Sequence, residues 1–161
     1  MSQAKYPAGP EELMPLADMR AISGLEFMRG VMEGRFPAAP IARTLGYTLI
    51  EVEEGRAVFA GEARFDAYNP IGSVHGGWFG TLLDSCMACA IQTRLPAGRS
   101  YTTLEYKINI LRAATVDSGL IRAEGTAIHV GRRTATAEGR MVDAAGKLYA
   151  TGTTTCIILD L

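Results

Sequence analysis

The feature that most constrains the fold is residues 76–94, a segment with the composition of a helix that is apolar on most of its faces. Its body holds Leu82, Leu83, Met87, Ala88, Ala90 and Ile91. A helix that is apolar all round has to be covered by other elements. The segment approaches the length of a membrane span, but it contains glycines and the polar residues Thr81, Asp84, Ser85 and Gln92. We therefore expect a buried central helix and no membrane span.

Strand patterns on both sides of this segment can supply the cover. From Tyr47 to Ala63, β-branched and apolar residues are split by Glu53-Glu54-Gly55-Arg56, which predicts a hairpin of two strands. Four longer strands are predicted downstream, separated by turn residues, at 102–111, 120–130, 133–143 and 148–159. Six strands and one apolar helix predict an α+β domain.

The N-terminal part has a different pattern. Residues 11–34 place Leu25, Met28 and Met32 at helical spacing, and Gly34 and the prolines after it end that pattern. We expect residues 1–40 to be a helical extension that packs on a domain formed by residues 41–161.

Composition narrows the class of partner and the compartment. The 161 residues carry 16 Lys+Arg and 17 Asp+Glu, a net charge of −1, which favours neither a nucleic-acid surface nor a membrane surface. The N-terminus lacks the basic start and apolar core of a signal peptide. These features predict a cytoplasmic protein.

The cysteines do not indicate a disulfide framework, because Cys86, Cys89 and Cys156 are an odd number. Cys86 and Cys89 form a CxxC motif, but it falls inside the apolar helix, and only His75 and His129 could complete a metal site. We expect thiols packed in the core, no bound metal, and no role for His129.

The run from Asn69 to Gly77, Asn-Pro-Ile-Gly-Ser-Val-His-Gly-Gly, carries the parts of an acyl-transfer site. The first N–H groups of a helix have no partner within it, so the start of the helix at Gly76 suits a developing oxyanion. The glycines let a substrate approach the backbone, although a tight turn alone would also need glycine.

Asp84 is the one acid in the apolar helix. Its neighbours at helical spacing supply no cation, and burial without a partner raises the pKa of a carboxylate and makes it a better base near neutral pH. From the sequence alone, Asp84 could equally lie on a wet face of the helix or pair with a distant arginine.

These residues resemble a known family. The pattern Asn-Pro-x-Gly-x-x-His-Gly-Gly, an Asp seven residues after the second glycine, and the segment from Thr103 to Arg112 are similar to the hotdog-fold acyl-CoA thioesterases of the phenylacetate-pathway (PaaI-like) type. The resemblance runs from about residue 41 to the C-terminus. It implies an antiparallel sheet wrapped round the long helix. It also implies edge-to-edge dimers with active sites at the subunit interface, and dimers that often pair again.

The resemblance also implies roles for the motif residues. Asp84 would be the general base on water or the nucleophile, and the Gly76 N–H would bind the thioester oxygen, beside Gly77. Asn69 would orient the water or the thioester, although Asn before Pro is usually a turn residue. His75 is expected to hold the loop.

The resemblance also implies roles for a threonine on the first long strand and for a group of arginines. Thr103 would hold the nucleophilic water, although the spacing could slip by one to Thr102. The turn Gly131-Arg132-Arg133, together with Arg112, would lie near the nucleotide of coenzyme A, because guanidinium groups grip phosphates bidentately. Solvated turn arginines are the alternative.

We therefore expect a homo-oligomeric acyl-CoA thioesterase that needs no cofactor, with coenzyme A entering as part of the substrate. Two alternatives stay open: an acyl-CoA-binding module without activity, and an enoyl-thioester hydratase. Trp78, Phe79, Met87 and the methionines of the extension predict an apolar pocket that suits aryl-acetyl or medium-chain groups.

Overall fold

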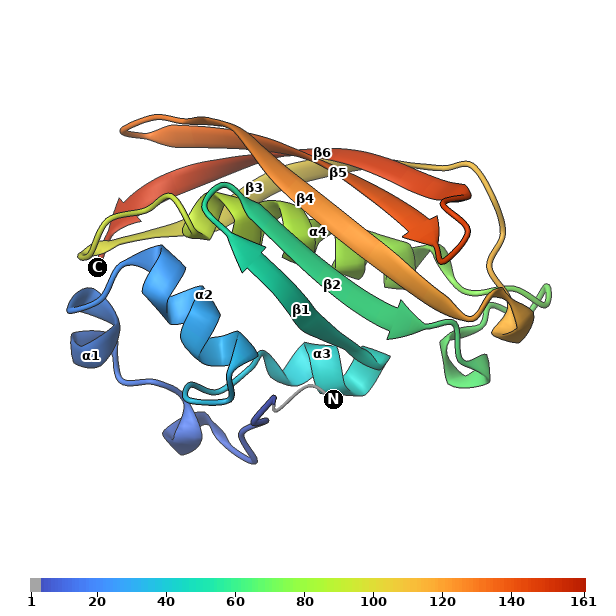
Figure 1. The fold of residues 1–161 in the computed structure, drawn as a ribbon, viewed down its shortest axis with the longest axis horizontal. Coiled ribbons are helices and arrows are strands. Elements are labelled where there is room, and N and C mark those ends of the chain that lie inside the picture. Colours follow the sequence, from blue (N-terminus) through green and yellow to red (C-terminus); the bar gives the residue numbers. More distant parts are fainter. Residues whose placement is uncertain (1–3) are drawn as a thin grey trace.

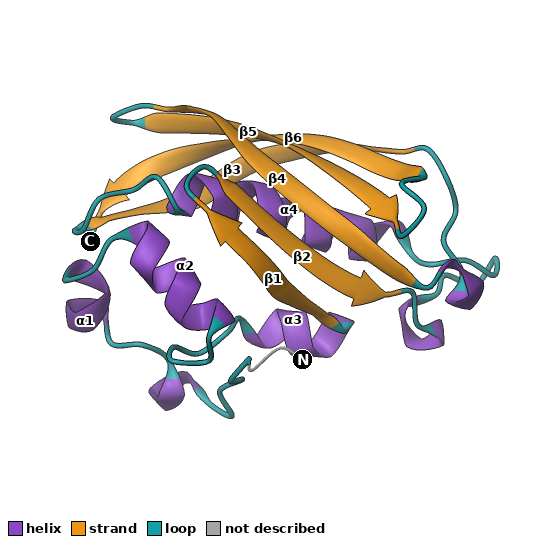
Figure 2. Ribbon diagram, in the orientation of Figure 1, coloured by secondary structure: helices purple, strands orange, loops and turns teal. Residues whose placement is uncertain are grey.

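The computed structural model describes residues 4–161 (Figures 1 and 2). Its strands are β1 (Tyr47–Glu53), β2 (Arg56–Glu62), β3 (Arg99–Ile110), β4 (Leu120–Val130), β5 (Thr134–Asp143) and β6 (Leu148–Asp160). Its α-helices are α1 (Leu16–Arg20), α2 (Gly24–Met32), α3 (Pro40–Leu45) and α4 (Gly76–Gln92). Three 3₁₀ turns, η1 (Pro10–Glu12), η2 (Phe65–Ala67) and η3 (Val116–Ser118), lie in the connections.

The strands form one antiparallel sheet in the order β1-β2-β4-β5-β6-β3, which curves round α4 (Figure 2). This is the hotdog architecture that the family resemblance implied, and all six strands lie in the segments where the sequence predicted them. The largest difference is at β3, which begins at Arg99, three residues before the predicted start. In the described part of the chain, no helix is long and apolar enough to cross a bilayer.

A row of glycines brings α4 against the middle of the sheet. Gly125 pairs with Gly139, and Gly139 pairs with Gly152, so the three lie side by side across β4, β5 and β6. A Cβ on Gly125 would fall 2.2 Å from the carbonyl oxygen of Cys86, and one on Gly139 would fall 2.8 Å from Met87 Cγ. The backbone of α4 therefore lies closer to the sheet than any side chain at these positions would allow.

The helical extension is present but broken into short pieces. A helix over 11–34 was expected, and the structure instead has η1, α1 and α2 in this region. The Ser23 hydroxyl caps α2 by accepting a hydrogen bond from the Glu26 N–H at 3.2 Å. Met28 and Val31 of α2 are buried in the same core as α4. Helix α3, which was not expected, begins at Pro40, a residue favoured in the first turn of a helix.

The two edges of the sheet differ. Helices α2 and α3 lie along β1, whereas β3 pairs only with β6 in the region the structure describes (Figure 1). Leu104, Tyr106 and Ile110 on β3 are exposed by 58%, 45% and 44%. An open edge with apolar side chains is a surface on which another strand can pair.

The glycine row gives a stability prediction. Gly125→Ala would force its new methyl group into the backbone of α4, and we expect it to lower the free energy of unfolding by about 1–3 kcal/mol, the usual cost of overpacking. Thr126→Ala, at the next and exposed position of β4, is the control. Urea unfolding of the two variants would measure the difference, and equal stabilities would contradict the close approach.

Candidate functional site

The loop before α4 is held by the Asn69 side chain. Its Oδ1 accepts hydrogen bonds from the backbone N–H of Ile71 at 3.1 Å and of Ser73 at 3.4 Å, and its Nδ2 donates to Ser73 Oγ at 3.2 Å. Within one protomer the amide therefore fixes the loop, which is the turn role of Asn before Pro. The same bonds fix the path of the chain into α4.

His75 caps the start of α4. Its Nδ1 accepts a hydrogen bond from the Gly77 N–H at 2.8 Å, so the ring is neutral in this bond and carries its proton on Nε2. The Gly77 N–H is thus occupied. The Gly76 N–H has no acceptor among residues 4–161, and it is the donor that remains available at the helix start.

Asp84 and Thr103 are brought together as predicted. Asp84 lies half-buried in the middle of α4, and its Oδ1 accepts a hydrogen bond from Thr103 Oγ1 at 3.0 Å. A bulge in β3 between Thr103 and Glu105 shifts the register there, and such bulges re-aim side chains beside functional sites. Thr102 is exposed, so the contact belongs to Thr103.

The surroundings of Asp84 favour its neutral form. Burial raises the pKa of this carboxyl above its ordinary value of 3.8, and the Thr103 hydrogen bond opposes part of that rise. Over residues 4–161, Asp84 takes part in no ion pair. Its second oxygen, Oδ2, accepts no hydrogen bond from the described residues. A raised pKa makes the ionised carboxylate a stronger base, which suits it to take a proton from a water molecule.

Gly76 and Asp84 are too far apart to act on one carbonyl group within a single chain. Eight residues of helix separate them, which is about 12 Å along the axis at 1.5 Å per residue. The start of α4 lies beside the end of β3, since a Cβ on Gly76 would be 3.3 Å from Ile110 Cδ1. Asp84 lies beside Thr103, near the beginning of the same strand. Within this chain the two groups therefore lie towards opposite ends of β3.

The arginine turn lies on the Asp84 side of the sheet. Thr103 pairs with Cys156, which pairs with Ala135, so the turn at 131–133 is two strands and a few residues away from Thr103, roughly 10 Å in each direction. The backbone of the turn is anchored by Arg99, which donates a hydrogen bond to the Arg132 carbonyl at 2.6 Å. The side chains of Arg132 and Arg133 are exposed.

Arg112 is not brought to this turn within one protomer. It follows the far end of β3, nine residues beyond Thr103, which is about 30 Å along an extended strand. Its backbone N–H donates to the Tyr149 carbonyl at 3.2 Å.

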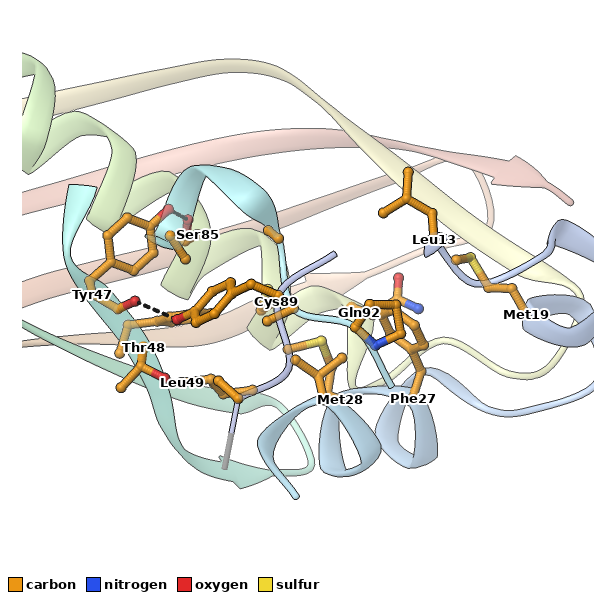
Figure 3. A pocket seen from close by; sticks show the side chains of 18 of the residues that line it. Leu13, Met19, Phe27, Met28, Tyr47, Thr48, Leu49, Ser85, Cys89 and Gln92 are labelled. Carbon is orange, nitrogen blue, oxygen red and sulfur yellow. Dashed lines mark hydrogen bonds between the residues drawn. The ribbon is translucent and has the colours of Figure 1, made fainter. Parts of the chain in front are cut away.

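The predicted apolar pocket exists, but only part of its expected lining is right. Trp78, Phe79 and Met87 are buried in the core and do not line it. A cavity of about 360 Å³ lies between the extension, β1 and α4. Figure 3 shows it extending from Tyr47 and Ser85 at one end to Leu13 and Met19 at the other.

Two cavity residues that adjoin the Asp84–Thr103 pair were not predicted from the sequence. Ser85 follows Asp84 in α4, and Tyr101 precedes Thr103 by two positions on β3. The period of two along a strand places Tyr101 on the same face as Thr103, and that spacing was the available signal.

The cysteines of the CxxC motif are packed in the core. Burial raises the pKa of the Cys86 thiol well above its ordinary value and that of Cys89 to about 12. Both therefore stay protonated, whereas metal binding and thiol exchange require the thiolate.

Comparison with known proteins places this geometry in a family. A family model described as the thioesterase superfamily matches residues 71–150. The 1,4-dihydroxy-2-naphthoyl-CoA hydrolase of Listeria monocytogenes is 29% identical over 108 residues, which are 67% of this chain and 86% of that protein. A phenylacetic acid degradation-related protein of Ralstonia eutropha is 31% identical and covers 81% of this chain and 98% of its own, with a TM-score of 0.73. A variant of the phenylacetic acid degradation protein PaaI of Thermus thermophilus is 32% identical and covers 74% and 98%, with a TM-score of 0.66.

The raised pKa of Asp84 predicts a dependence of stability on pH. Between the ordinary value of 3.8 and the raised value in the folded state, the folded protein binds a proton that the unfolded chain has lost. Stability is therefore lost as pH rises through this window. The Asp84→Asn variant carries no charge at this position. The free energy of unfolding of the variant minus that of wild type should therefore increase as pH rises through the window and then level off. Urea unfolding at a series of pH values measures this, and a relative stability that decreases with pH would contradict it.

Proposed function

Because this chain belongs to the thioesterase superfamily, we propose that it hydrolyses an acyl-CoA thioester to the free acid and coenzyme A. The observation that carries the proposal is the half-buried Asp84 carboxylate, which has no cationic partner in the described part of the chain and accepts a hydrogen bond from the Thr103 hydroxyl. The CoA-thioester hydrolase of Listeria supports coenzyme A as the thiol.

In the proposed reaction Asp84 acts as general base. Its Oδ2 takes a proton from a water held beside Thr103, and the oxygen of that water bonds to the thioester carbon. The carbonyl oxygen becomes an oxyanion held by a Gly76 N–H at the positive end of a helix. The carbon–sulfur bond then breaks, and the proton on Asp84 passes to the leaving thiolate. Asn69 keeps the loop, and with it Gly76, in position.

The complete site is shared between two protomers. Asp84 and Gly76 of one chain are about 12 Å apart along α4, so the oxyanion donor beside Asp84 comes from a second copy. The open edge of β3, with its exposed apolar side chains, is the surface that supports this pairing. When two β3 strands pair antiparallel about a two-fold axis, the end of one strand lies beside the beginning of the other. That arrangement places Gly76 of each chain near Asp84 of the other chain.

The same pairing explains the arginines. Gly131, Arg132 and Arg133 lie on the Asp84 side of the sheet, and Arg112 of the partner subunit reaches this side because its β3 runs in the opposite direction. We propose that this cluster binds the phosphates of coenzyme A. The acyl group then extends away from the turn.

Activity assays test the assignment. Wild-type protein with an acyl-CoA panel should release free thiol, and Asp84→Ala should lower kcat by about 10²-fold or more, the scale of a lost general base. Asp117→Ala, an exposed acid in η3, is the control. A change in enoyl absorbance without thiol release would indicate a hydratase, and binding without either product would indicate a non-catalytic module. Near wild-type kcat in folded Asp84→Ala would rule out the mechanism.

Mixed dimers test the shared site. Asn69→Ala and Asp84→Ala, each nearly inactive alone, place their lesions in different halves. After subunit exchange about half the dimers are mixed, and each mixed dimer has one intact site of two, so activity should return to about one quarter of wild type. Mass spectrometry confirms the exchange. If activity does not return after confirmed exchange, both residues act within one subunit.

A further inference from the structure

We propose that the cavity beneath the N-terminal extension is the acyl pocket, and that Gln92 in its wall selects elongated acyl groups carrying a hydrogen-bonding group near their far end. The inference rests on the proposed thioester hydrolysis and names the substrate class of that site. It is carried by the position of the cavity, by its lining and by one buried polar side chain, that of Gln92, which has no hydrogen-bond partner among residues 4–161.

The cavity begins where the reacting groups lie. Ser85, Cys89 and Gln92 line it from α4, and their spacing of four and three residues places them on one stripe of the helix. Ser85 is the residue next to Asp84. Tyr101 of β3 also lines the cavity and lies on the same face of the strand as Thr103, two positions away. A thioester carbonyl at Asp84 therefore has one end of the cavity beside it.

The walls are mostly apolar, and the extension supplies much of them. Met19, Phe27, Met28 and Val31 come from the N-terminal segment, with Leu13 at the far end (Figure 3). The family model matches only from residue 71 onward, so this wall lies outside the matched region. A pocket of about 360 Å³ is at the small end of the range for ligand sites, and it suits one slender apolar group.

Several polar groups at the Asp84 end of the cavity are already satisfied. The Tyr6 hydroxyl donates to the Tyr47 carbonyl at 3.3 Å, and the Tyr47 hydroxyl shares a hydrogen bond of 3.0 Å with Ser85 Oγ. Tyr101 makes a side-chain hydrogen bond with Cys89. Because these groups are paired with one another, they leave little free polarity at the near end for the acyl chain to meet.

Gln92 is the exception. It is only 7% exposed and lines the cavity, and its side-chain amide has no hydrogen-bond partner among residues 4–161 (Figure 3). The amide is accessible from the cavity and offers it both a donor and an acceptor. A polar atom on the bound acyl group would satisfy it.

The distance between Asp84 and Gln92 sets the length of an acyl group that can reach both residues. Gln92 lies eight residues beyond Asp84, about 12 Å along the axis of α4. An extended chain whose bonds are about 1.5 Å long needs roughly eight to ten carbons to cover this distance. A single benzoyl or phenylacetyl group is shorter than this, so of the two classes that the sequence left open, the cavity favours medium-chain groups.

The experiment compares 10-hydroxydecanoyl-CoA, decanoyl-CoA and butyryl-CoA as substrates of the full chain. Wild type should hydrolyse the hydroxylated chain with a kcat/KM roughly 10-fold above that of decanoyl-CoA, the scale of one hydrogen bond. Gln92→Met, which keeps the length of the side chain and removes its polarity, should abolish or reverse this ratio. Arg94→Met, at an exposed position just after α4, is the matched control and should keep it.

A second variant tests the far end without disturbing the core. Leu13 is 47% exposed, so Leu13→Trp should fold, and its larger ring should shorten the pocket and lower the ratio of decanoyl-CoA to butyryl-CoA hydrolysis. The enzyme could instead hydrolyse the three acyl-CoA substrates at ratios that do not depend on chain length and that neither Gln92→Met nor Leu13→Trp changes. That result would contradict the assignment of the cavity as the acyl pocket, but it would not contradict the proposed function.

Binding separates the pocket from the reaction. If no thioester is hydrolysed, the proposed function fails, and calorimetry with 10-hydroxydecanoic acid still decides the pocket. Binding that Gln92→Met weakens would support the cavity as an acyl site, and no binding to wild type would overturn it.

Discussion

The contact between α4 and the glycine row is the constraint on which the rest of the structure depends. Gly125, Gly139 and Gly152 are register partners on adjacent strands, so their missing side chains form a trough that receives the Cys86–Met87 turn of the helix. A slip of one residue would turn a neighbour such as Glu124 or Glu138 towards the helix. The trough therefore fixes the register of the strands and the height of the helix together, and the positions of Asp84 and Thr103 follow from both.

Much of this fold can be predicted from the sequence, because its strongest signals are local. The apolar run of α4 and the hairpin at Glu53–Arg56 depend on neighbouring residues only, and both lie where they were predicted. The start of β3 was missed because an edge strand with few buried residues has no clear alternation. The glycine row was missed because its three glycines lie on different strands, and they can be seen to be neighbours only when the pairing register is known. In the site, the resemblance predicted Asp84 beside Thr103. The alternation along β3, which leaves Thr102 exposed and turns Thr103 towards α4, decides between the two threonines.

A rigid helix also limits how a site can be assembled. Because α4 cannot shorten, its free first N–H and its carboxylate remain about 12 Å apart, whatever the side chains around them do. The two groups can serve one carbonyl only if a second helix end is supplied from outside the chain. The edges of the sheet agree with this requirement, since the extension covers β1 and leaves β3 open. In the proposed mechanism, dimerisation is thus a condition of catalysis.

The proposed pocket divides chemistry and selection between different parts of the chain. Asp84 and Thr103 lie on α4 and β3, which the glycine row and the sheet hold rigid. The far wall of the cavity belongs to α1, α2 and the turns near them, which pack through contacts such as Gly24 against the Gln92 carbonyl, where no side chain would fit. Substitutions in the extension can therefore reshape the cavity without moving the carboxylate. Gln92 is the link between the two parts, since its backbone receives the extension and its side chain faces the space where the acyl group would end.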